Sequence, residues 1–399
     1  MTAADTPLPE NNTTQEKTVN KTVLVLGGYG LFGKRVCAGL LRIDGVKVLV
    51  AGRDASAARA FADSLGERVS ALQIDWQAPD FIAKLSAVNP RILIHCAGPF
   101  QAQDYRVASA AIGIGAHYID LADGREFVRG VASLNQAALA KGVSVISGAS
   151  SVPALSSAVV SALTKGWQSV QHIDIGISPG NKTERGLATM RAILGYVGEK
   201  IPAWRAAKPA HAIGWLGLRR FSYPKPAGTR WLVDCDVPDL ALLPECYPEL
   251  QTLRFGAGLE LSVLHLGLWV LAGLRRLRLL PNLARFAQFF KSSSERFLSY
   301  GTDVGAMHVL VSGIDADGEP TQSTWTLVAE SGHGTAVPAA ASIAIARALL
   351  EGSTIFNGAV PAVSALPLQK YLVELAPFKI EIASSVRNES TPIRNQNAT

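Results

Sequence analysis

The first half of the chain alternates apolar runs with stretches of helical periodicity. Apolar runs such as TVLVLGG, VKVLVAGR and RILIHCAGPF are separated by amphipathic segments such as LFGKRVCAGLLRI. Continuously apolar runs are typical of strands that are buried on both faces of a parallel sheet. Roughly six strand–helix repeats follow one another, which predicts an α/β fold with a doubly wound parallel Rossmann sheet over residues 21–152.

After Pro153 the alternation stops, and strand-like runs such as HIDIGISPG and TRWLVDCDV take its place. A hairpin is predicted where MHVLVSGI and STWTLVAE flank the turn residues 315–318. Residues 153–334 are therefore expected to form a second, α+β domain with a largely antiparallel sheet. We expect this domain to hold the substrate and to form a homodimer contact.

The two ends of the chain differ from the rest in composition. Residues 1–20 are polar and lack the basic start and apolar run of a signal peptide, and residues 386–399 have the same polar character. We expect both segments to be disordered and the protein to be cytoplasmic. The remainder is expected to fold into large cores, because 48% of all residues are hydrophobic and only 18% are charged.

Charge and cysteine content argue against several classes of protein. The net charge of +6 is small for 399 residues, and no run of Lys and Arg is interleaved with aromatic residues, so nucleic acid is not an expected partner. The four cysteines form no CxxC pair, which argues against a metal site and a disulfide framework. The sequence also lacks a GxSxG elbow, an HExxH motif and a Walker loop, so hydrolases and kinases are not indicated.

A glycine-rich loop joins the first predicted strand to the first predicted helix. Glycines at these positions let the chain turn tightly, and they bring backbone N–H groups and a helix N-terminus close to a pyrophosphate. The pattern GxGxxG therefore predicts a dinucleotide cofactor. The residues assigned to it in this loop are Gly27, Gly28, Tyr29, Gly30, Leu31, Phe32 and Gly33.

The end of the second predicted strand indicates which dinucleotide is bound. A carboxylate about twenty residues after the loop would hold the ribose 2′-hydroxyl of NAD. Here the strand ends in Arg53, whose planar cation suits the 2′-phosphate of NADP(H). The adjacent Asp54 precedes a predicted helix and is expected to be its N-cap. NADP(H) is therefore the expected cofactor.

Two further strand ends are expected at the cofactor. Asp75 closes the third strand, where it either hydrogen-bonds the adenine or caps the following turn; the sequence does not separate these alternatives. The fourth strand ends in Ala97, Gly98 and Pro99, where small residues let the backbone approach the ribose and the nicotinamide.

Five segments in this order, GGYGLFG, AGR, HCAGPF, GAHYIDLADG and GASSVPALSSAVV, resemble the NADP-binding domain of saccharopine dehydrogenase-like oxidoreductases. The resemblance implies a two-domain reductase with a C-terminal helix that packs back on the Rossmann domain, so residues 335–385 are expected there. By position it assigns Gly28, Gly30 and Gly33 to the pyrophosphate. It likewise assigns Arg53 to the 2′-phosphate and Gly98 with Pro99 to the nicotinamide side. The family segment continues toward a Gly-Glu pair, where this chain has Ala-Asp-Gly at 122–124.

Hydride transfer belongs to the cofactor, so the protein must position a substrate and supply or remove one proton. Asp104, Tyr105 and His117 are the candidate acid–base residues. Tyr196 and Lys200 match the YxxxK of short-chain dehydrogenases, but they follow the sixth strand, and we assign them no role. We expect an NADP(H)-dependent oxidoreductase that acts on a C=N, C=O or C=C bond of a small molecule. The alternative is a non-catalytic NADP-binding or membrane-associated scaffold or sensor.

One apolar stretch, residues 259–274, precedes three arginines at 275, 276 and 278. At about sixteen residues it is shorter than the roughly twenty that span a bilayer. A buried helix and a dimer contact are the favoured readings. The alternative is a peripheral membrane contact through residues 259–278, with the arginines at anionic headgroups.

Overall fold

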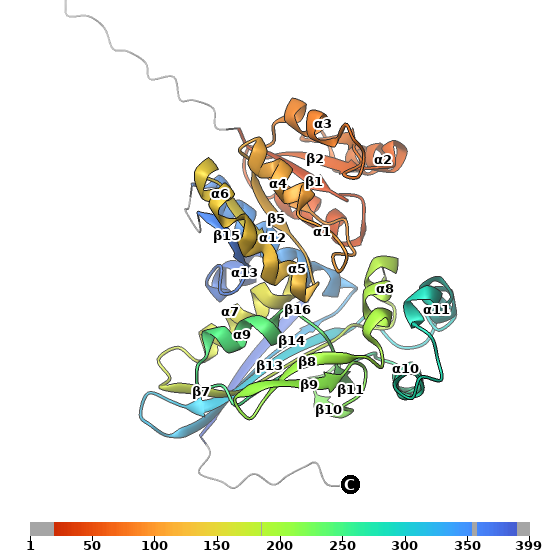
Figure 1. Cartoon of the computed structure of the whole chain (residues 1–399), viewed down its shortest axis with the longest axis vertical. Coiled ribbons are helices and arrows are strands. Elements are labelled where there is room, and N and C mark those ends of the chain that lie inside the picture. Colours follow the sequence, from red (N-terminus) through yellow and green to blue (C-terminus); the bar gives the residue numbers. More distant parts are fainter. Residues whose placement is uncertain (1–19, 185, 353–356, 389–399) are drawn as a thin grey trace, which may run out of the picture.

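The computed structural model describes residues 20–184, 186–352 and 357–388, and two β-sheets organise it (Figure 1). The first is a seven-stranded parallel sheet in the order β15-β6-β5-β4-β1-β2-β3. The predicted doubly wound sheet is thereby confirmed. Its strands are β1 (Thr22–Leu26), β2 (Lys47–Gly52), β3 (Val69–Gln73), β4 (Ile92–His95), β5 (His117–Asp120), β6 (Ser144–Ser147) and β15 (Gly358–Pro361).

Helices cover both faces of this sheet. Alternate residues of β1 enter different cores, with Val23 and Val25 on one face and Leu24 and Leu26 on the other. This two-sided burial explains why the strand is apolar throughout. The helices of this domain are α1 (Leu31–Leu40), α2 (Ala55–Leu65), α3 (Phe81–Val88), α4 (Arg106–Gly113), α5 (Arg125–Gly130) and α6 (Asn135–Lys141).

The second sheet has nine strands and is antiparallel except between β12 and β7. The predicted hairpin is confirmed as β13 (Gly305–Ile314) paired with β14 (Pro320–Ala329). The path runs β10-β11-β12-β7-β13-β14-β16, and β8 joins β9 to β12. The remaining strands are β7 (Ser169–Ser178), β8 (Lys200–Arg205), β9 (Lys208–Ile213), β10 (Arg219–Ser222), β11 (Thr229–Asp234), β12 (Thr252–Ala257) and β16 (Ile380–Asn388).

The C-terminal part of the chain contributes to both sheets. Helix α12 (Ala336–Leu350) packs on α1 so closely that a Cβ on Gly39 would lie 2.3 Å from Cδ1 of Ile343. After it β15 extends the first sheet, α13 (Leu368–Leu375) follows, and β16 forms an edge of the second sheet. Because β16 continues to Asn388, the expected disordered tail does not begin at residue 386. The expected leader at 1–19 and the tail from 389 lie outside the described residues.

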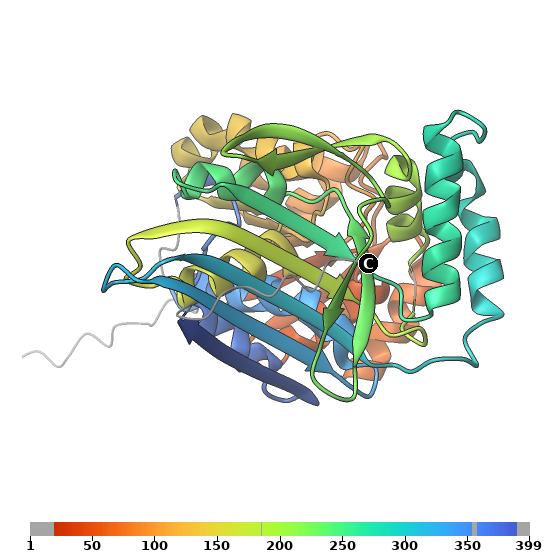
Figure 2. The same ribbon diagram turned by 90° about the horizontal axis from the view of Figure 1, so that it is seen from below.

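The second domain carries five helical pieces of interest for the site: α7 (Ser156–Leu163), α8 (Leu187–Tyr196), α9 (Asp239–Cys246), α10 (Ser262–Arg276) and α11 (Ala287–Glu295). Figure 2 shows α10 and α11 side by side at one flank of the sheet, and we call residues 262–295 the helical hairpin. Within the described residues, one helix, His333–Leu350, is long and apolar enough to span a bilayer, and 78% of it is buried inside the protein. It is the core helix between the two domains.

Candidate functional site

The glycine-rich loop lies where the carboxyl end of β1 leads into α1. Gly27 has a φ of 77°, and its N–H and that of Gly28 both donate to the carbonyl of Ala51, at 2.8 and 3.2 Å. A Cβ on Gly33 would lie 2.1 Å from the carbonyl oxygen of Gly27, so a larger residue cannot occupy that position without moving the loop. The loop therefore packs tightly against β2 and α1.

The start of α1 is open to an anion. Gly30 is the exposed N-cap residue and provides no side-chain acceptor, and the first turn contains no acidic residue. The first N–H groups of a helix need acceptors and carry partial positive charge. A pyrophosphate fits this position, because it would satisfy those donors without competing against a protein carboxylate.

At the end of β2, the neighbouring charged residues Arg53 and Asp54 have different surroundings. Asp54 caps α2, since its Oδ1 accepts from the N–H groups of Ser56 and Ala57 at 2.9 and 3.0 Å. Hydrogen bonds from Ser56 and Ala57 lower the pKa of Asp54. The ring of Tyr29 covers Gly52, and its hydroxyl accepts from the N–H of Asp54 at 3.0 Å. The Arg53 side chain is exposed and makes no hydrogen bond or ion pair with any described residue.

The other cofactor-side predictions fall along the same sheet edge. Oδ1 of Asp75 accepts from the N–H of Gln77 at 3.0 Å, so this carboxylate caps the turn after β3. Ala97 lies against the glycine loop, because a Cβ on Gly27 would be 3.1 Å from its nitrogen. Gly98 and Pro99 are exposed beside it, and Gln103 holds the segment by donating to the carbonyl of Pro99 at 2.9 Å.

Asp104 and Tyr105 have structural contacts. Oδ1 of Asp104 accepts from the N–H of Arg106 at 3.1 Å at the start of α4. The Tyr105 hydroxyl donates to the carbonyl of Phe127 at 2.7 Å, and its ring packs on the Phe127 ring with centroids 4.9 Å apart. Burial raises the pKa of Tyr105. These contacts argue against our choice of the two side chains as acid–base groups.

His117 is a poor candidate for a positional reason. It is the first residue of β5, whereas the cofactor edge is formed by the carboxyl ends of the strands. Its Nδ1 accepts from the N–H of Ser144 at 3.0 Å, and burial lowers its pKa to about 4. His117 therefore fastens β6 to β5 at the edge of the sheet opposite to the predicted cofactor site, which argues against an acid–base role.

A buried aspartate lies at the carboxyl end of the same strand. Oδ1 of Asp120 accepts from the N–H of Ala122, the hydroxyl of Ser147 and the N–H of Gly148, at 3.0, 3.0 and 2.8 Å. Burial raises its pKa to about 6 against the effect of these bonds. Asp120 thus fixes the ends of β5 and β6 beside the cofactor edge.

A polar cluster that the sequence did not indicate lies at the junction of the two domains. Its members are Gln101, Asp123, Arg125, Tyr196, Cys235 and Asp236, and we call them the junction cluster. Gln101 donates to Asp123 at 3.0 Å, Arg125 pairs with Asp236 at 2.8 Å, and the Tyr196 hydroxyl lies 2.8 Å from Sγ of Cys235.

Electrostatics link these three pairs. Burial raises the pKa of Asp123, the Gln101 bond lowers it, and the charge of Asp236 raises it further. Burial also holds the pKa of Tyr196 well above its usual range. Position after a parallel strand could have indicated Asp123. Tyr196 belongs to the YxxxK pattern to which we assigned no role, and nothing local indicates Asp236; both residues come from the second domain.

A cavity of about 620 Å³ adjoins the glycine loop. Leu31 and Phe32, which directly follow Gly30, line it from the first domain, together with Ser151 after β6. The second sheet, α8, the helical hairpin and the start of α12 supply the other walls. The candidate site thus consists of a phosphate loop, a polar junction cluster and an adjoining cavity. Among the described residues there is no group of His, Cys, Asp and Glu that could hold a metal ion.

Comparisons with known proteins agree with this architecture. Residues 23–156 match the model of the saccharopine dehydrogenase NADP binding domain. Saccharopine dehydrogenase (L-Glu forming) from Saccharomyces cerevisiae aligns with a TM-score of 0.65 at 15% identity, covering 92% of this chain and 100% of that one. Homospermidine synthase from Legionella pneumophila, in complex with NAD, aligns at 0.59 and 12%, covering 95% and 94%. A search of curated proteins gives no match. The resemblance over residues 23–156 and the predicted fold class, a parallel sheet followed by a largely antiparallel one, are confirmed.

Proposed function

Because residues 23–156 form a saccharopine dehydrogenase-type NADP binding domain, we propose that this chain is an NADP(H)-dependent oxidoreductase. The reaction is hydride transfer to or from a C=N, C=O or C=C bond. The observation that carries the proposal is the open N-terminus of α1 beside an arginine that has no protein partner among the described residues. Bound nicotinamide would supply or accept the hydride, and the chain must bind, orient and exchange one proton.

Substitution of Arg53 tests whether this residue makes the protein prefer NADPH over NADH. We expect Arg53→Ala to weaken NADPH binding by roughly ten- to hundredfold, because a charge-assisted contact to the 2′-phosphate contributes about 1.5 to 3 kcal/mol. NADH binding should change little. Titration followed by nicotinamide fluorescence measures both affinities.

The matched control for this experiment is Arg91→Ala. Arg91 is also exposed, but it precedes β4 at the opposite edge of the sheet, so its loss changes net charge equally without touching the loop. Equal weakening of NADPH and NADH by Arg53→Ala would show that another residue selects the cofactor. Failure of the native protein to bind either dinucleotide would refute the proposed function.

The junction cluster supplies the proton in this proposal. Asp123 follows β5 at the cofactor edge, next to the Gly98–Pro99 segment through Gln101. Its raised pKa keeps the carboxyl protonated to higher pH than an ordinary aspartate, which suits a group that donates a proton in reduction and accepts one in oxidation. Arg125 and Asp236 hold the two domains together around it.

A peripheral contact with an anionic membrane is our second proposal. Ten of the fifteen exposed large apolar side chains among the described residues lie between 263 and 300, on the helical hairpin and its flanks. Exposed arginines at 276, 278, 285 and 296 accompany them. Arg275 does not belong to this set, because it is 8% exposed and donates to the carbonyl of Leu194 and to Glu199. The outer face of the apolar stretch predicted at 259–274 is therefore not buried within the described chain, which leaves the dimer contact and the membrane contact as the alternatives.

A further inference from the structure

The cavity beside the glycine loop has walls of aliphatic and aromatic side chains. Strands β7, β13 and β14 contribute Ile177, Met307 and Leu327, and α8 contributes Met190. The helical hairpin closes the opposite side with residues such as Leu268 and Phe290. At about 620 Å³ the cavity lies within the range of pockets that hold an organic ligand.

The described part of the lining contains little that could bind a charged substrate. No Lys, Arg or His occurs among the described residues that line it, and the only acidic one is Glu184, which is exposed. An unpaired ammonium or carboxylate placed inside would lose its hydration without gaining a partner. The described lining therefore suits a hydrocarbon chain better than the charged groups of an amino acid.

The two ends of the cavity have different surroundings. At the cofactor end, Leu31 follows the phosphate loop, and the buried Ser151 follows β6. At the other end Val263 of α10 and Phe289 of α11 line the cavity although each is 67% exposed. This exposure marks a mouth between the two helices of the hairpin. A chain entering there would have its leading end beside the phosphate loop, at Leu31 and Phe32.

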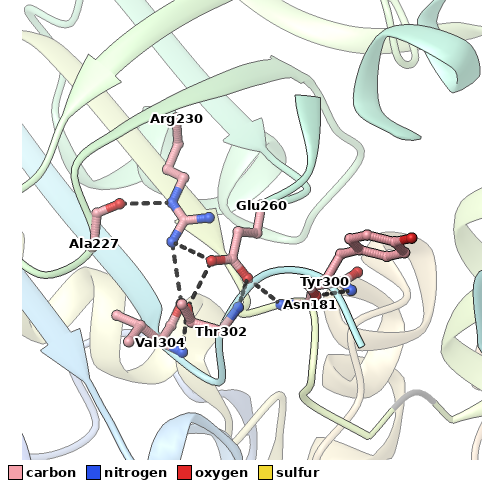
Figure 3. A network of polar contacts seen from close by, with 7 residues as sticks. All are labelled: Asn181, Ala227, Arg230, Glu260, Tyr300, Thr302 and Val304. Atoms are coloured by element: carbon pink, nitrogen blue, oxygen red, sulfur yellow. Dashed lines mark hydrogen bonds and ion pairs between the residues drawn. The ribbon is translucent and has the colours of Figure 1, made fainter. Parts of the chain in front are cut away.

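A polar clamp fixes the base of the hairpin (Figure 3). Glu260, just before α10, accepts from the N–H of Asn181 at 2.6 Å and from the N–H and hydroxyl of Thr302 at 2.9 and 2.7 Å. Arg230 pairs with the same carboxylate at 3.4 Å and donates to the carbonyl of Ala227 at 3.0 Å. The base of the hairpin is thus rigidly held, and its exposed outer part keeps the mouth accessible.

We propose that this cavity binds the hydrocarbon chain of a single-chain lipid substrate, with the group to be reduced or oxidised at the cofactor end. The apolar lining, the position against the phosphate loop and the exposed mouth all point to that class of ligand. The assignment of a reacting group at the cofactor end rests on the proposed function, whereas binding of the hydrocarbon chain does not depend on it.

Chain binding can be measured with a neutral probe, N-phenyl-1-naphthylamine, which fluoresces when it enters an apolar site. We expect octanol, dodecanol and hexadecanol to displace it with rising affinity, up to roughly fourfold for each buried methylene. The measurement is made below the aggregation limit of each alcohol. NADPH binding is titrated in the same samples.

Two glycines of α10 provide a matched pair of variants. Gly267 lines the cavity and Gly273 does not, and a Cβ on either would meet nothing within 4 Å. Gly267→Phe should therefore narrow the cavity and weaken hexadecanol binding by roughly tenfold or more. Gly273→Phe changes the helix propensity of α10 in the same way, and it should leave hexadecanol binding unchanged. Met190→Trp, which fills the cavity from α8, should reproduce the Gly267→Phe effect.

These measurements test the lipid-chain assignment independently of the proposed function. No displacement by any alcohol, or equal effects of Gly267→Phe and Gly273→Phe, would overturn the lipid-chain assignment. Chain-length-dependent displacement that Gly267→Phe and Met190→Trp abolish would support it. If the alcohols bind in this way but NADPH does not, the cavity assignment stands and the proposed function fails.

Discussion

At the scale of single residues, the phosphate loop could be predicted because its requirements are local. Gly33 must be glycine because a Cβ there would collide with the carbonyl oxygen of Gly27, which precedes it closely in the sequence, and the spacing of the glycines reflects that requirement. The acid–base group could not be predicted in this way. Asp104 and Tyr105 follow the Gly98–Pro99 segment closely in sequence, yet Asp104 accepts from the N–H of Arg106 and Tyr105 donates to the carbonyl of Phe127.

Asp123→Asn tests the proton role of the junction cluster. We expect turnover to fall by roughly a hundredfold or more, because a positioned acid–base group contributes about 10²- to 10⁴-fold. NADPH affinity should be unchanged. The measurement is the rate of NADPH oxidation with a substrate found by screening imines, ketones and enoyl compounds that carry alkyl chains. Asp104→Asn is the matched control, and an equal loss in that variant would contradict the assignment.

The pH dependence of reduction gives a second readout for Asp123. If it donates the proton, kcat falls as pH rises through the pKa of Asp123, which burial and the charge of Asp236 raise. Removing that charge in Asp236→Asn lowers the pKa of Asp123, so the fall should move to lower pH. A residue with a purely structural role would lose activity without this displacement of the profile.

At the scale of elements, the apolar periodicity of the sequence predicted most strands and helices. The residues at which they begin and end depend on long-range contacts. The helical segment after β5 is divided into α5 and α6 by a 3₁₀ turn at Val131–Leu134. Gly130 ends α5 where the Tyr105 hydroxyl would lie 2.5 Å from a Cβ. Strands β15 and β16 escaped prediction because their partners, β6 and β14, lie far away in the sequence.

Glu260→Ala should destabilise the hairpin at its base. Arg230 and Glu260 are 5% and 10% exposed, and removing one partner of a buried pair costs about 3 to 5 kcal/mol. Urea unfolding measures the total loss, and hydrogen exchange should localise it to residues 181–184 and 297–304. The control, Glu295→Ala, removes a half-exposed ion pair with Lys291 and should cost less than about 1 kcal/mol. Loss of protection spread evenly over the first domain would contradict the clamp.

At the scale of the whole molecule, the C-terminal chain joins the domains and brings the cavity to the cofactor edge. Arg42, in the turn after α1, and Arg347 of α12 both bind Glu374 of α13, at 2.8 and 2.7 Å, and Glu374 is 2% exposed. With α12 fixed to α1 in this way, Thr335 receives a hydrogen bond from Arg35 and lines the cavity next to Leu31. The sequence suggested two domains, but which side chains meet between them depends on this packing.

The exposed hairpin and the cavity mouth lie on the same two helices, so a membrane that held the hairpin would also present an apolar chain to the mouth. We expect the protein to co-sediment with vesicles that contain anionic lipid and to release them at high salt. Arg276→Ala combined with Arg278→Ala should weaken binding by roughly thirtyfold, because each arginine near an anionic surface contributes about 1 kcal/mol.

Two further variants separate the membrane from a second copy of the chain. Arg91→Ala combined with Arg106→Ala removes the same charge from exposed positions of the first domain and should leave vesicle binding intact. Leu277→Ser combined with Leu279→Ser, at side chains 69% and 67% exposed, should abolish it, because the apolar face supplies the insertion energy. If vesicles do not bind, and light scattering shows a dimer that the leucine variant dissociates, the hairpin is a dimer contact and the membrane proposal is wrong.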